Sequence, residues 1–466
     1  VEIGSDTVLR SAIANSLEAS FILSEWDAIF NSKLDLLTDT LLAIELNNRS
    51  KFGPRSIATN WEERSSGVYE YFKSSKVSRK PDLSNISLSR RLRPISLDKA
   101  LTYLKSNTNS GLPFITRKSN VKELIIPNFT RLLDRRDPCI LFTRTQEAGK
   151  TRNVWGYPIV DTLNEMRYYR PLLAYQRALI WRSALRDPGE VDKNITRIIN
   201  NSGSNYLVSI DFSEYDTTVK NRLQEGSFEY IKRLFQAQFN EEIEYIQERF
   251  STIGLITPIG ILEGQHGVPS GSTFTNEVDS IAQYICAKDF GLTDDAIDIQ
   301  GDDGVYSTNE PNRLIRHFEE FGLNVNTEKS HVSKSEVIYL QNLYSTDYIR
   351  DGICRGIYST YRALGRIIFP ERYTKYNDYG ITGADYNSIR AITILENCRY
   401  HPLFEDLVKF ILKLDKYSLE FTQHGLTNYI KRIQQTEGVE GIFKYRRGDD
   451  LSGIRSFETV KLLSKH

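Results

Sequence analysis

The chain has 466 residues, 40% of them hydrophobic, and its 60 acidic and 60 basic residues give a formal net charge of zero. This composition excludes an intrinsically disordered chain and allows one large core or two to three smaller ones. The four cysteines show no CxxC spacing, and no run reaches the roughly 18 to 20 apolar residues of a membrane span. We therefore expect a reducing compartment, no zinc site and no membrane segment. Because the chain starts at Val1 and contains one methionine, Met166, we expect a processed piece of a longer product.

Acidic residues concentrate in the middle of the chain. Residues 211–310 contain 19 acidic and 6 basic residues, which leaves an excess of 13 positive charges for the rest of the chain. An acidic centre with basic surroundings suits a protein that holds metal cations and grips a polyanion around them. Solvated helix faces, such as that of Glu241 and Glu244, are the plainer explanation for part of this acidity.

The first 205 residues predict helices and basic segments. Apolar residues at spacings of three and four predict a helix that ends before Gly53-Pro54: Leu34, Leu37, Leu41 and Ile44. Residues 73–93 carry seven basic residues against one acidic, which indicates either a phosphate-contacting loop or an ordinary solvated one. Residues 167–182 interleave arginines with aromatic residues, and there we favour a packed helix over a nucleic-acid surface.

One aspartate stands at the end of a predicted strand. Residues 206–212 read as a buried strand with Asp211 near its end, and Asp216 follows at the start of a helical stretch. A carboxylate in the middle of such a strand would be buried and unpaired, whereas one at its end can face a site. The spacing of Asp211 and Asp216 therefore indicates a functional site.

Two further aspartates stand in a predicted hairpin turn. Residues 296–300 and 305–307 predict its strands, and its turn requires positive φ, which Gly301 and Gly304 can supply. The turn then presents Asp302 and Asp303 at its tip. Adjacent carboxylates repel each other, and a hard divalent cation such as Mg²⁺ relieves that repulsion. Two such ions about 3.5 to 4 Å apart stabilise an in-line phosphoryl displacement.

A loop and helix lie between these segments, at residues 267–280, GVPSGSTFTNEVDS. The apolar stripe that predicts the buried helix face is Phe274, Val278, Ile281 and Ile285. The opposite face carries Ser272, Asn276, Ser280 and Gln283. Asn276 can share a hydrogen-bonded target with Asp216, and a ribose 2′-hydroxyl, both donor and acceptor, is such a target.

The ordered set of these residues resembles motifs A, B and C of viral RNA-dependent RNA polymerases. Asp211-x-x-x-x-Asp216 matches motif A, Ser270-Gly271 with Thr275-Asn276 matches motif B, and Gly301-Asp302-Asp303 matches motif C. The sequence of motif B looks most like that of the same motif in the enzymes of double-stranded RNA viruses of the partitivirus and picobirnavirus group. The resemblance runs from about residue 106 to residue 360.

Four other motifs of that family can be matched. Residues 108–113, TNSGLP, are similar to motif G, which lines template entry, and residues 144–152, RTQEAGKTR, look like motif F, which holds the incoming triphosphate. Lys329 follows an amphipathic helix where motif D carries its lysine, and residues 337–344 lie where motif E supports the growing strand.

The resemblance implies an α/β (α+β) fold of the right-hand polymerase type, with fingers, a ferredoxin-like antiparallel palm sheet with helices, and a helical thumb. The expected division is an N-terminal helical extension at 1–65, fingers at 66–205 and 222–266, palm at 206–221 and 267–356, and the thumb and C-terminal region at 357–466.

The resemblance also implies template-directed RNA synthesis with two Mg²⁺ ions, or Mn²⁺ as a substitute, held by Asp211, Asp302 and Asp303. Lys329 would protonate the departing pyrophosphate, although a plainly solvated lysine explains this position equally well. The implied nucleotide site consists of Arg144, Lys150, Arg152, Asp216, Ser270, Gly271, Thr275 and Asn276. The implied contacts with template or product RNA are Thr108, Ser110, Gly111, Pro113 and Arg355.

The expected partners are template RNA, product RNA, nucleoside triphosphates and a viral capsid protein, and the expected location is the virion interior and the host cytoplasm. A reverse transcriptase shares the carboxylate geometry, but the pairing of Asp216 with Asn276 favours a ribose. A catalytically inactive polymerase-fold scaffold would not need all three carboxylates. A positive-strand virus replicase shares motifs A to C and differs mainly around motif B.

Overall fold

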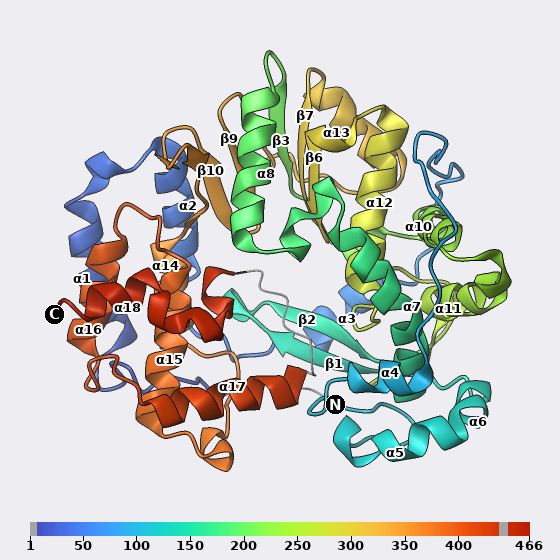
Figure 1. Ribbon diagram of the computed structural model, residues 1–466, viewed down its shortest axis with the longest axis horizontal. Helices are drawn as coiled ribbons and strands as arrows, with labels where there is room; N and C mark the ends of the chain where they lie inside the picture. The colour runs from blue at the N-terminus through green and yellow to red at the C-terminus, as the bar shows by residue number, and fades with distance from the viewer. Residues whose placement is uncertain (1–6, 438–445) are drawn as a thin grey trace.

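A four-stranded antiparallel sheet forms the upper centre of the molecule (Figure 1). The computed structural model describes residues 7–437 and 446–466. The strand order is β6-β7-β3-β8, and each neighbouring pair is antiparallel. The strands are β3 (Tyr206–Ile210), β6 (Ile297–Gln300), β7 (Asp303–Thr308) and β8 (His331–Ser333). This is the expected antiparallel palm sheet.

Alternating residues of the palm sheet pack against helices on both faces. Val208 and Tyr306 are buried in a core with α10 (Asn221–Leu234), α12 (Thr275–Phe290) and α13 (Pro311–Glu320). Leu207 and Val305 pack on the other side, against α8 (Pro188–Asn201). The predicted stripe of α12 is confirmed, because all four of its apolar residues are buried.

The fingers lie to the right of the palm and below it in Figure 1. Their sheet has the order β2-β1-β4-β5, in which β1 pairs with β2 over six residues. The strands are β1 (Cys139–Thr145), β2 (Thr151–Gly156), β4 (Leu255–Thr257) and β5 (Gly260–Leu262). The helices are α3 (Trp61–Glu70), α4 (Leu97–Thr102), α5 (Lys122–Ile125), α6 (Phe129–Asp134), α7 (Ile159–Arg177) and α11 (Asn240–Thr252).

The thumb lies to the left in Figure 1 and is mainly helical. Its helices are α14 (Thr360–Ile368), α15 (Gly383–Glu396), α16 (Phe404–Leu414), α17 (Gln423–Glu437) and α18 (Glu458–Leu463). A three-stranded sheet joins it to the palm, and its strands are β9 (Glu336–Tyr339), β10 (Asn342–Ser345) and β13 (Ile357–Tyr358). The expected palm boundary at residue 356 therefore falls within a continuous sheet. The short hairpin of β11 (Ile349–Arg350) and β12 (Ile353–Cys354) turns at Asp351 and Gly352, both with positive φ, as a type I′ turn requires.

The helices of the N-terminal segment pack on the thumb. Trp26 and Phe30, on α1 (Ala19–Asn31), are fully buried in the thumb core. The expected continuous stripe from Leu34 is wrong, because the chain breaks before α2 (Asp39–Ser50) and Leu34 is 40% exposed. The expected end of the helix before Gly53-Pro54 is confirmed.

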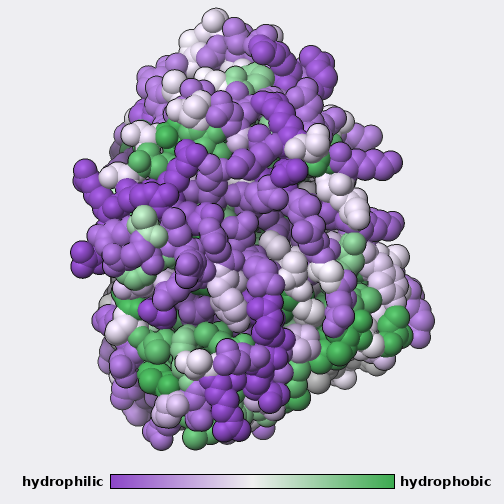
Figure 2. Space-filling view, turned by 90° about the vertical axis from the view of Figure 1, so that its right-hand side faces the viewer, coloured by the Kyte–Doolittle hydropathy of each residue, from purple (hydrophilic) through white to green (hydrophobic). Residues whose placement is uncertain are grey.

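The surface of the fingers carries the basic segment of residues 73–93. Three of its seven basic residues form ion pairs within the protein: Lys73 with Glu70, Arg79 with Asp289 and Lys80 with Glu229. This pairing favours a structural role over the phosphate-contacting one. Figure 2 shows that hydrophilic residues dominate this side of the molecule, while hydrophobic residues gather at the height of α5 and α6. Among the described residues, no helix is long and apolar enough to cross a membrane.

Candidate active site

The two aspartates of the predicted hairpin lie at the turn between β6 and β7. Gln300 pairs with Asp303, so Gly301 and Asp302 form a two-residue turn. Gly301 has a φ of 61° and Asp302 has a negative φ, which is the pattern of a type II′ turn. The prediction that Gly304 also supplies positive φ is wrong. Gly304 lies within β7 and needs to be glycine for another reason.

Side chains of α12 hold this turn from behind. The Gln283 amide donates to the carbonyl oxygen of Gly301 (2.7 Å), and the hydroxyl of Ser280 accepts from its N–H (2.8 Å). The side-chain oxygen of Gln283 also accepts from the Tyr306 hydroxyl (2.7 Å). A Cβ at Gly304 would lie 2.3 Å from that same oxygen, so a side chain there would displace Gln283. The polar face of α12 therefore fixes the position of Asp302 and Asp303.

Asp211 lies next to this turn on the neighbouring strand. Ile210 at the end of β3 pairs with Gly304, which places Asp211 beside the start of β7. Its backbone is anchored, because its N–H donates to the Ser330 hydroxyl (3.0 Å) and its carbonyl accepts from the Asn326 N–H (2.8 Å). The two strands thus bring together all three aspartates that the sequence singles out.

The three carboxylates interact unfavourably with one another. Burial, together with the nearby charges of Asp302 and Asp211, raises the pKa of Asp303 to about 8. Burial is the main cause that raises the pKa of Asp302, and the charge of Asp216 is the second. Burial also raises the pKa of Asp211. Across residues 7–437 and 446–466, no three carboxylate, imidazole or thiol groups are already arranged to hold a metal ion. The carboxylates are neighbours but do not form a preassembled coordination shell.

Cationic side chains surround this acidic centre. Lys329 and Lys150 oppose the rise in the pKa of Asp211, and Arg152 opposes it at Asp302 and Asp303. These three cations therefore lie within electrostatic reach of the acidic centre. Lys51, from the segment after α2, acts on Asp211 in the same way, and no sequence signal marks it.

Arg144 occupies a different position from the other cations of its motif. It pairs with Arg152 across β1 and β2, so both point to the same face of the fingers sheet. Its guanidinium contacts Glu371 of the thumb at 3.3 Å, and 49% of its side chain is exposed. Arg144 thus joins fingers to thumb in this conformation.

The loop at residues 267–271 docks against both palm and fingers. The N–H of Val268 donates to the backbone carbonyl of Asp216 (2.7 Å), and the carbonyl of Ser270 accepts from the Trp155 N–H (3.0 Å). A Cβ at Gly271 would lie 2.0 Å from the Trp155 carbonyl oxygen, so only glycine fits there. Thr275 closes the loop by donating from its hydroxyl to the Pro269 carbonyl (3.0 Å).

A buried glutamate that the sequence does not single out supports this loop. Glu165 of α7 accepts hydrogen bonds from the Ser272 hydroxyl (2.5 Å) and from the Thr273 N–H (3.0 Å). Burial raises its pKa to about 8. Periodicity alone gives no reason to expect a glutamate on the buried side of α7, so this contact is visible only in three dimensions.

Asp216 and Asn276 are placed separately in the structure. Asp216 lies in a short helix of its own, α9 (Tyr215–Thr218), rather than at the start of α10 as expected, and its carboxylate accepts from the Ser270 hydroxyl. The side-chain oxygen of Asn276 lies near Gly301. Both side chains are described, and no hydrogen bond joins them. A shared ligand would have to bridge them.

The segment that resembles motif G forms a tight loop on the fingers. Gly111 has a φ of 63°, and a Cβ there would lie 2.4 Å from the Tyr157 carbonyl oxygen. The Leu112–Pro113 peptide bond is cis. Ser110 is fully buried, and its hydroxyl accepts from the Thr116 N–H (3.2 Å), so any effect of Ser110 on RNA is indirect. The Thr108 hydroxyl accepts from Lys118 (2.8 Å).

Arg355 follows the β11–β12 hairpin and faces a cavity away from the carboxylates. Its guanidinium lies 3.5 Å from buried Asp192 and 5.3 Å from the ring centre of Tyr400. A neighbouring cavity of about 390 Å³ opens in front of Asp303, between the palm and the thumb, and Asn276 and Arg362 also line it.

Comparisons with known proteins find related sequences and a similar fold. The family model described as viral RNA-dependent RNA polymerase matches residues 68–356. A potential RNA-dependent RNA polymerase of a human picobirnavirus is 29% identical over 92% of this chain and 86% of its own length. An RNA-directed RNA polymerase of Cryptosporidium parvum virus 1 is 26% identical over 52% of each chain. The crystal structure of a human picobirnavirus RNA-dependent RNA polymerase is 27% identical, with a TM-score of 0.84 over 99% of this chain and 94% of that one.

Proposed function

The chain belongs to the family of viral RNA-dependent RNA polymerases and has their right-hand fold, and we propose that Asp211, Asp302 and Asp303 form its metal-dependent catalytic centre. It is a nucleotidyltransferase whose substrates are RNA and nucleoside triphosphates, and enzymes of this family use divalent metal ions. The observation that supports the proposal is the pairing of β3 with β7, which brings Asp211 next to the turn that carries Asp302 and Asp303. Reverse transcription and an inactive scaffold are not favoured, because the named relatives are RNA polymerases.

The donor set suits Mg²⁺, with Mn²⁺ as a substitute. Carboxylate oxygens are the ligands that hard divalent cations prefer. Burial and the neighbouring carboxylates raise the pKa values of Asp302 and Asp303, and a divalent cation would favour their ionised forms. Two such ions, when bound, would supply the positive charge that stabilises the attacking and leaving oxygens of the phosphoryl transfer. Asp211 and Asp302 act as principal ligands in this scheme, and Asp303 supports them.

Basic residues of the fingers and palm position the incoming triphosphate. Lys150 and Arg152 are close enough to the carboxylates to shift their pKa values, and they neutralise phosphate charge without moving protons. Arg144 joins them once its contact with Glu371 is released. Lys329 delivers a proton to the departing pyrophosphate.

The motif B loop selects the sugar. Asp216, held by Ser270, and Asn276, beside the catalytic turn, bracket the position where a ribose 2′-hydroxyl bridges them. Gly271 and Thr275 keep the loop in the conformation that allows this. On the two sides of the site, the Thr108 to Pro113 loop guides the template and Arg355 contacts the product strand.

The biological role that fits these properties is the replication and transcription of a double-stranded viral RNA genome. We place this synthesis in the virion interior and the host cytoplasm, with a viral capsid protein as partner. The similarity to a picobirnavirus polymerase supports the genome type.

A metal-dependent extension assay tests the proposed function. Single-stranded RNA, with and without an oligonucleotide primer, is incubated with either the four ribonucleoside or the four deoxyribonucleoside triphosphates, and with Mg²⁺, Mn²⁺ or a chelator. Product complementary to the template should appear with either metal and disappear with the chelator. Full-length product in the chelator, or product only from deoxyribonucleotides, would refute the proposal.

A further inference from the structure

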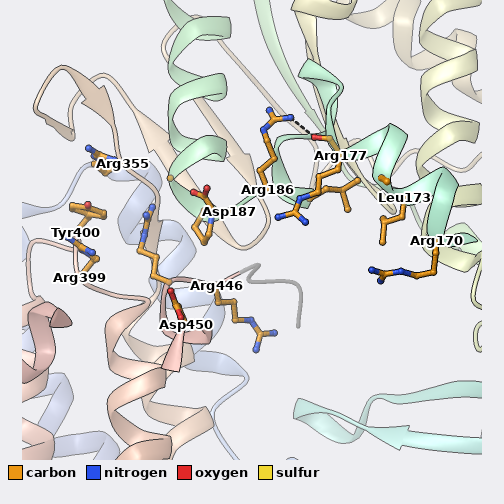
Figure 3. Close-up of a pocket in the computed structure, with 15 residues that line it drawn as sticks. Arg170, Leu173, Arg177, Arg186, Asp187, Arg355, Arg399, Tyr400, Arg446 and Asp450 are labelled. Carbon is orange, nitrogen blue, oxygen red and sulfur yellow. Dashed lines mark hydrogen bonds between the residues drawn. The ribbon is translucent and has the colours of Figure 1, made fainter. Parts of the chain in front are cut away.

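A second cavity, of about 910 Å³, lies between the end of α7, the start of α8 and the thumb, and we refer to it as the arginine cavity. Seven of its fifteen lining residues are arginines and two are aspartates. Figure 3 shows Arg170 and Arg177 along one wall and Arg355 and Arg399 on the opposite one, beside Tyr400. Positive charge therefore faces the cavity from both sides.

Acidic partners neutralise this charge only in part. Arg399 lies 3.8 and 3.9 Å from the carboxylates of Glu396 and Glu458. Arg355 and Arg447 share a single carboxylate, that of Asp192 (3.5 and 2.7 Å). Arg186 donates to two backbone carbonyls at 2.9 Å, and its nearest carboxylate is 3.9 Å away. The guanidinium of Arg177 is exposed and makes no ion pair with any residue that the structure describes. Such an accumulation of like charge is stabilised by a polyanion.

The arginine cavity adjoins the cavity of about 390 Å³ in front of Asp303, which we call the catalytic cavity. Pro188, Arg446 and Arg447 line both cavities, and Asp303 and Asn276 line only the catalytic one. A strand that passes the carboxylates therefore meets the arginines next. Arg446 also lies beside Arg366, whose charge lowers the pKa of Arg446, so positive charge crowds at the junction of the two cavities.

An aromatic ring stands within this group of cations. The guanidinium carbons of Arg355, Arg399 and Arg447 lie 5.3, 4.7 and 4.6 Å from the ring centre of Tyr400. A guanidinium group can bind two oxygens of one phosphate through two parallel hydrogen bonds. In proteins that bind single-stranded nucleic acids, bases stack on aromatic rings next to a basic groove. Charges on opposite walls suit a backbone with one phosphate per nucleotide better than the clustered phosphates of a free nucleotide.

We propose that the arginine cavity binds the phosphate backbone of an RNA strand next to the catalytic centre, an inference that rests on the proposed function. Arg177 and Arg186 contact phosphates from the fingers side, and the arginines around Tyr400 contact them from the thumb side. The cavity thereby extends the grip on RNA beyond the residues that the motifs identify.

Arg177→Gln tests the proposal through the salt dependence of RNA binding. The affinity for a fluorescent single-stranded RNA is measured without nucleotides or metal at several salt concentrations between about 50 and 200 mM. Each lost phosphate contact reduces the slope of log affinity against log salt by about 0.7 for single strands. We expect Arg177→Gln to show that loss and about three- to tenfold weaker binding at low salt, and Arg177→Lys to retain both. Arg222→Gln, which removes an exposed arginine paired with Glu225 on α10, is the matched control and should bind as wild type does.

A second measurement does not depend on charge. All four native cysteines are buried, and Ala174 is exposed on the cavity wall, so Ala174→Cys introduces a single accessible thiol. RNA with a thiol-reactive group on its backbone should crosslink to this variant and not to wild type, and unlabelled RNA should compete while tripolyphosphate and free nucleotides should not.

Unchanged salt slopes in Arg177→Gln, together with no crosslink at position 174, would overturn the inference. Competition by free nucleotide but not by RNA would also overturn it, because the cavity would then be a nucleotide site. Since these measurements need no catalysis, an inactive chain with the expected RNA effects would refute the proposed function alone. An active chain without them would refute this inference alone.

Discussion

Gln283 on α12 donates a hydrogen bond to the carbonyl oxygen of Gly301 over 2.7 Å and so links the helix after the motif B loop to the turn that carries Asp302. Its oxygen accepts from Tyr306 on β7, so one buried side chain holds both the turn and the strand that follows it. The position of the catalytic carboxylates therefore depends on a residue that touches no substrate.

Gln283→Leu should destabilise the protein and lower its activity. The substitution leaves the Gly301 carbonyl and the Tyr306 hydroxyl buried without their partner, and each such group costs about 1 to 3 kcal/mol. Denaturant unfolding should show the loss, together with a lower rate of nucleotide incorporation. Gln265→Leu, at an exposed loop position, should change the free energy of unfolding by no more than about 0.5 kcal/mol. Equal effects of the two substitutions would contradict this role of Gln283.

Glu165 should make stability depend on pH. Its pKa is about 8 in the folded protein against an ordinary value of 4.5, so between these values the folded state binds more protons than the unfolded state. The free energy of unfolding of the wild type should therefore fall as pH rises from about 5 to 8 and level off above that. Glu165→Gln removes this titration, so its stability relative to wild type should increase over the same range. If the free energies of unfolding of the two proteins changed in parallel with pH, burial would not raise the pKa of Glu165.

Asp216→Ala should weaken the discrimination between ribo- and deoxyribonucleotides. Loss of one hydrogen bond to the 2′-hydroxyl should reduce the ratio of kcat/KM values roughly tenfold. Ser270→Ala, which removes the hydroxyl that holds the Asp216 carboxylate, should act in the same direction with a smaller effect. Steady-state incorporation of ATP and dATP opposite the same template base measures both. If the ratio of the kcat/KM values for ATP and dATP were the same in Asp216→Ala as in the wild type, Asp216 would have no role in sugar selection.

Arg152→Gln should raise the KM for nucleoside triphosphates more than Arg144→Gln does. Arg152 lies within the electrostatic reach of Asp302 and Asp303, whereas Arg144 is held by Glu371. A charge-assisted hydrogen bond contributes about 1.5 to 3 kcal/mol, so Arg152→Gln should raise KM about tenfold or more. The two residues face each other across β1 and β2, which makes them matched variants. A larger effect at Arg144 would reverse this assignment.

Local patterns in the sequence were sufficient for the elements that place the carboxylates. The apolar runs of β3 and β7 and the stripe of α12 each follow one period, and the resulting elements bury the residues that those periods select.

Contacts between distant segments could not be read from such patterns. Glu165 reaches the loop at Ser272 from more than one hundred positions away, and Lys51 approaches Asp211 from the N-terminal segment. The tolerance of glycine for positive φ predicts that Gly304 lies in the turn, whereas its real constraint is the space that Gln283 occupies. The break between α1 and α2 likewise depends on how both helices pack on the thumb.

The most direct test of the central claim is nucleotide incorporation by Asp302→Asn in Mg²⁺, with RNA affinity and thermal unfolding measured on the same preparation. The change keeps the shape of the turn and removes one carboxylate charge from the metal site. Incorporation should fall by at least about a thousandfold, while RNA affinity and the unfolding temperature remain close to those of the wild type. Turnover at the wild-type rate would show that Asp302 holds no catalytic metal and would contradict the account.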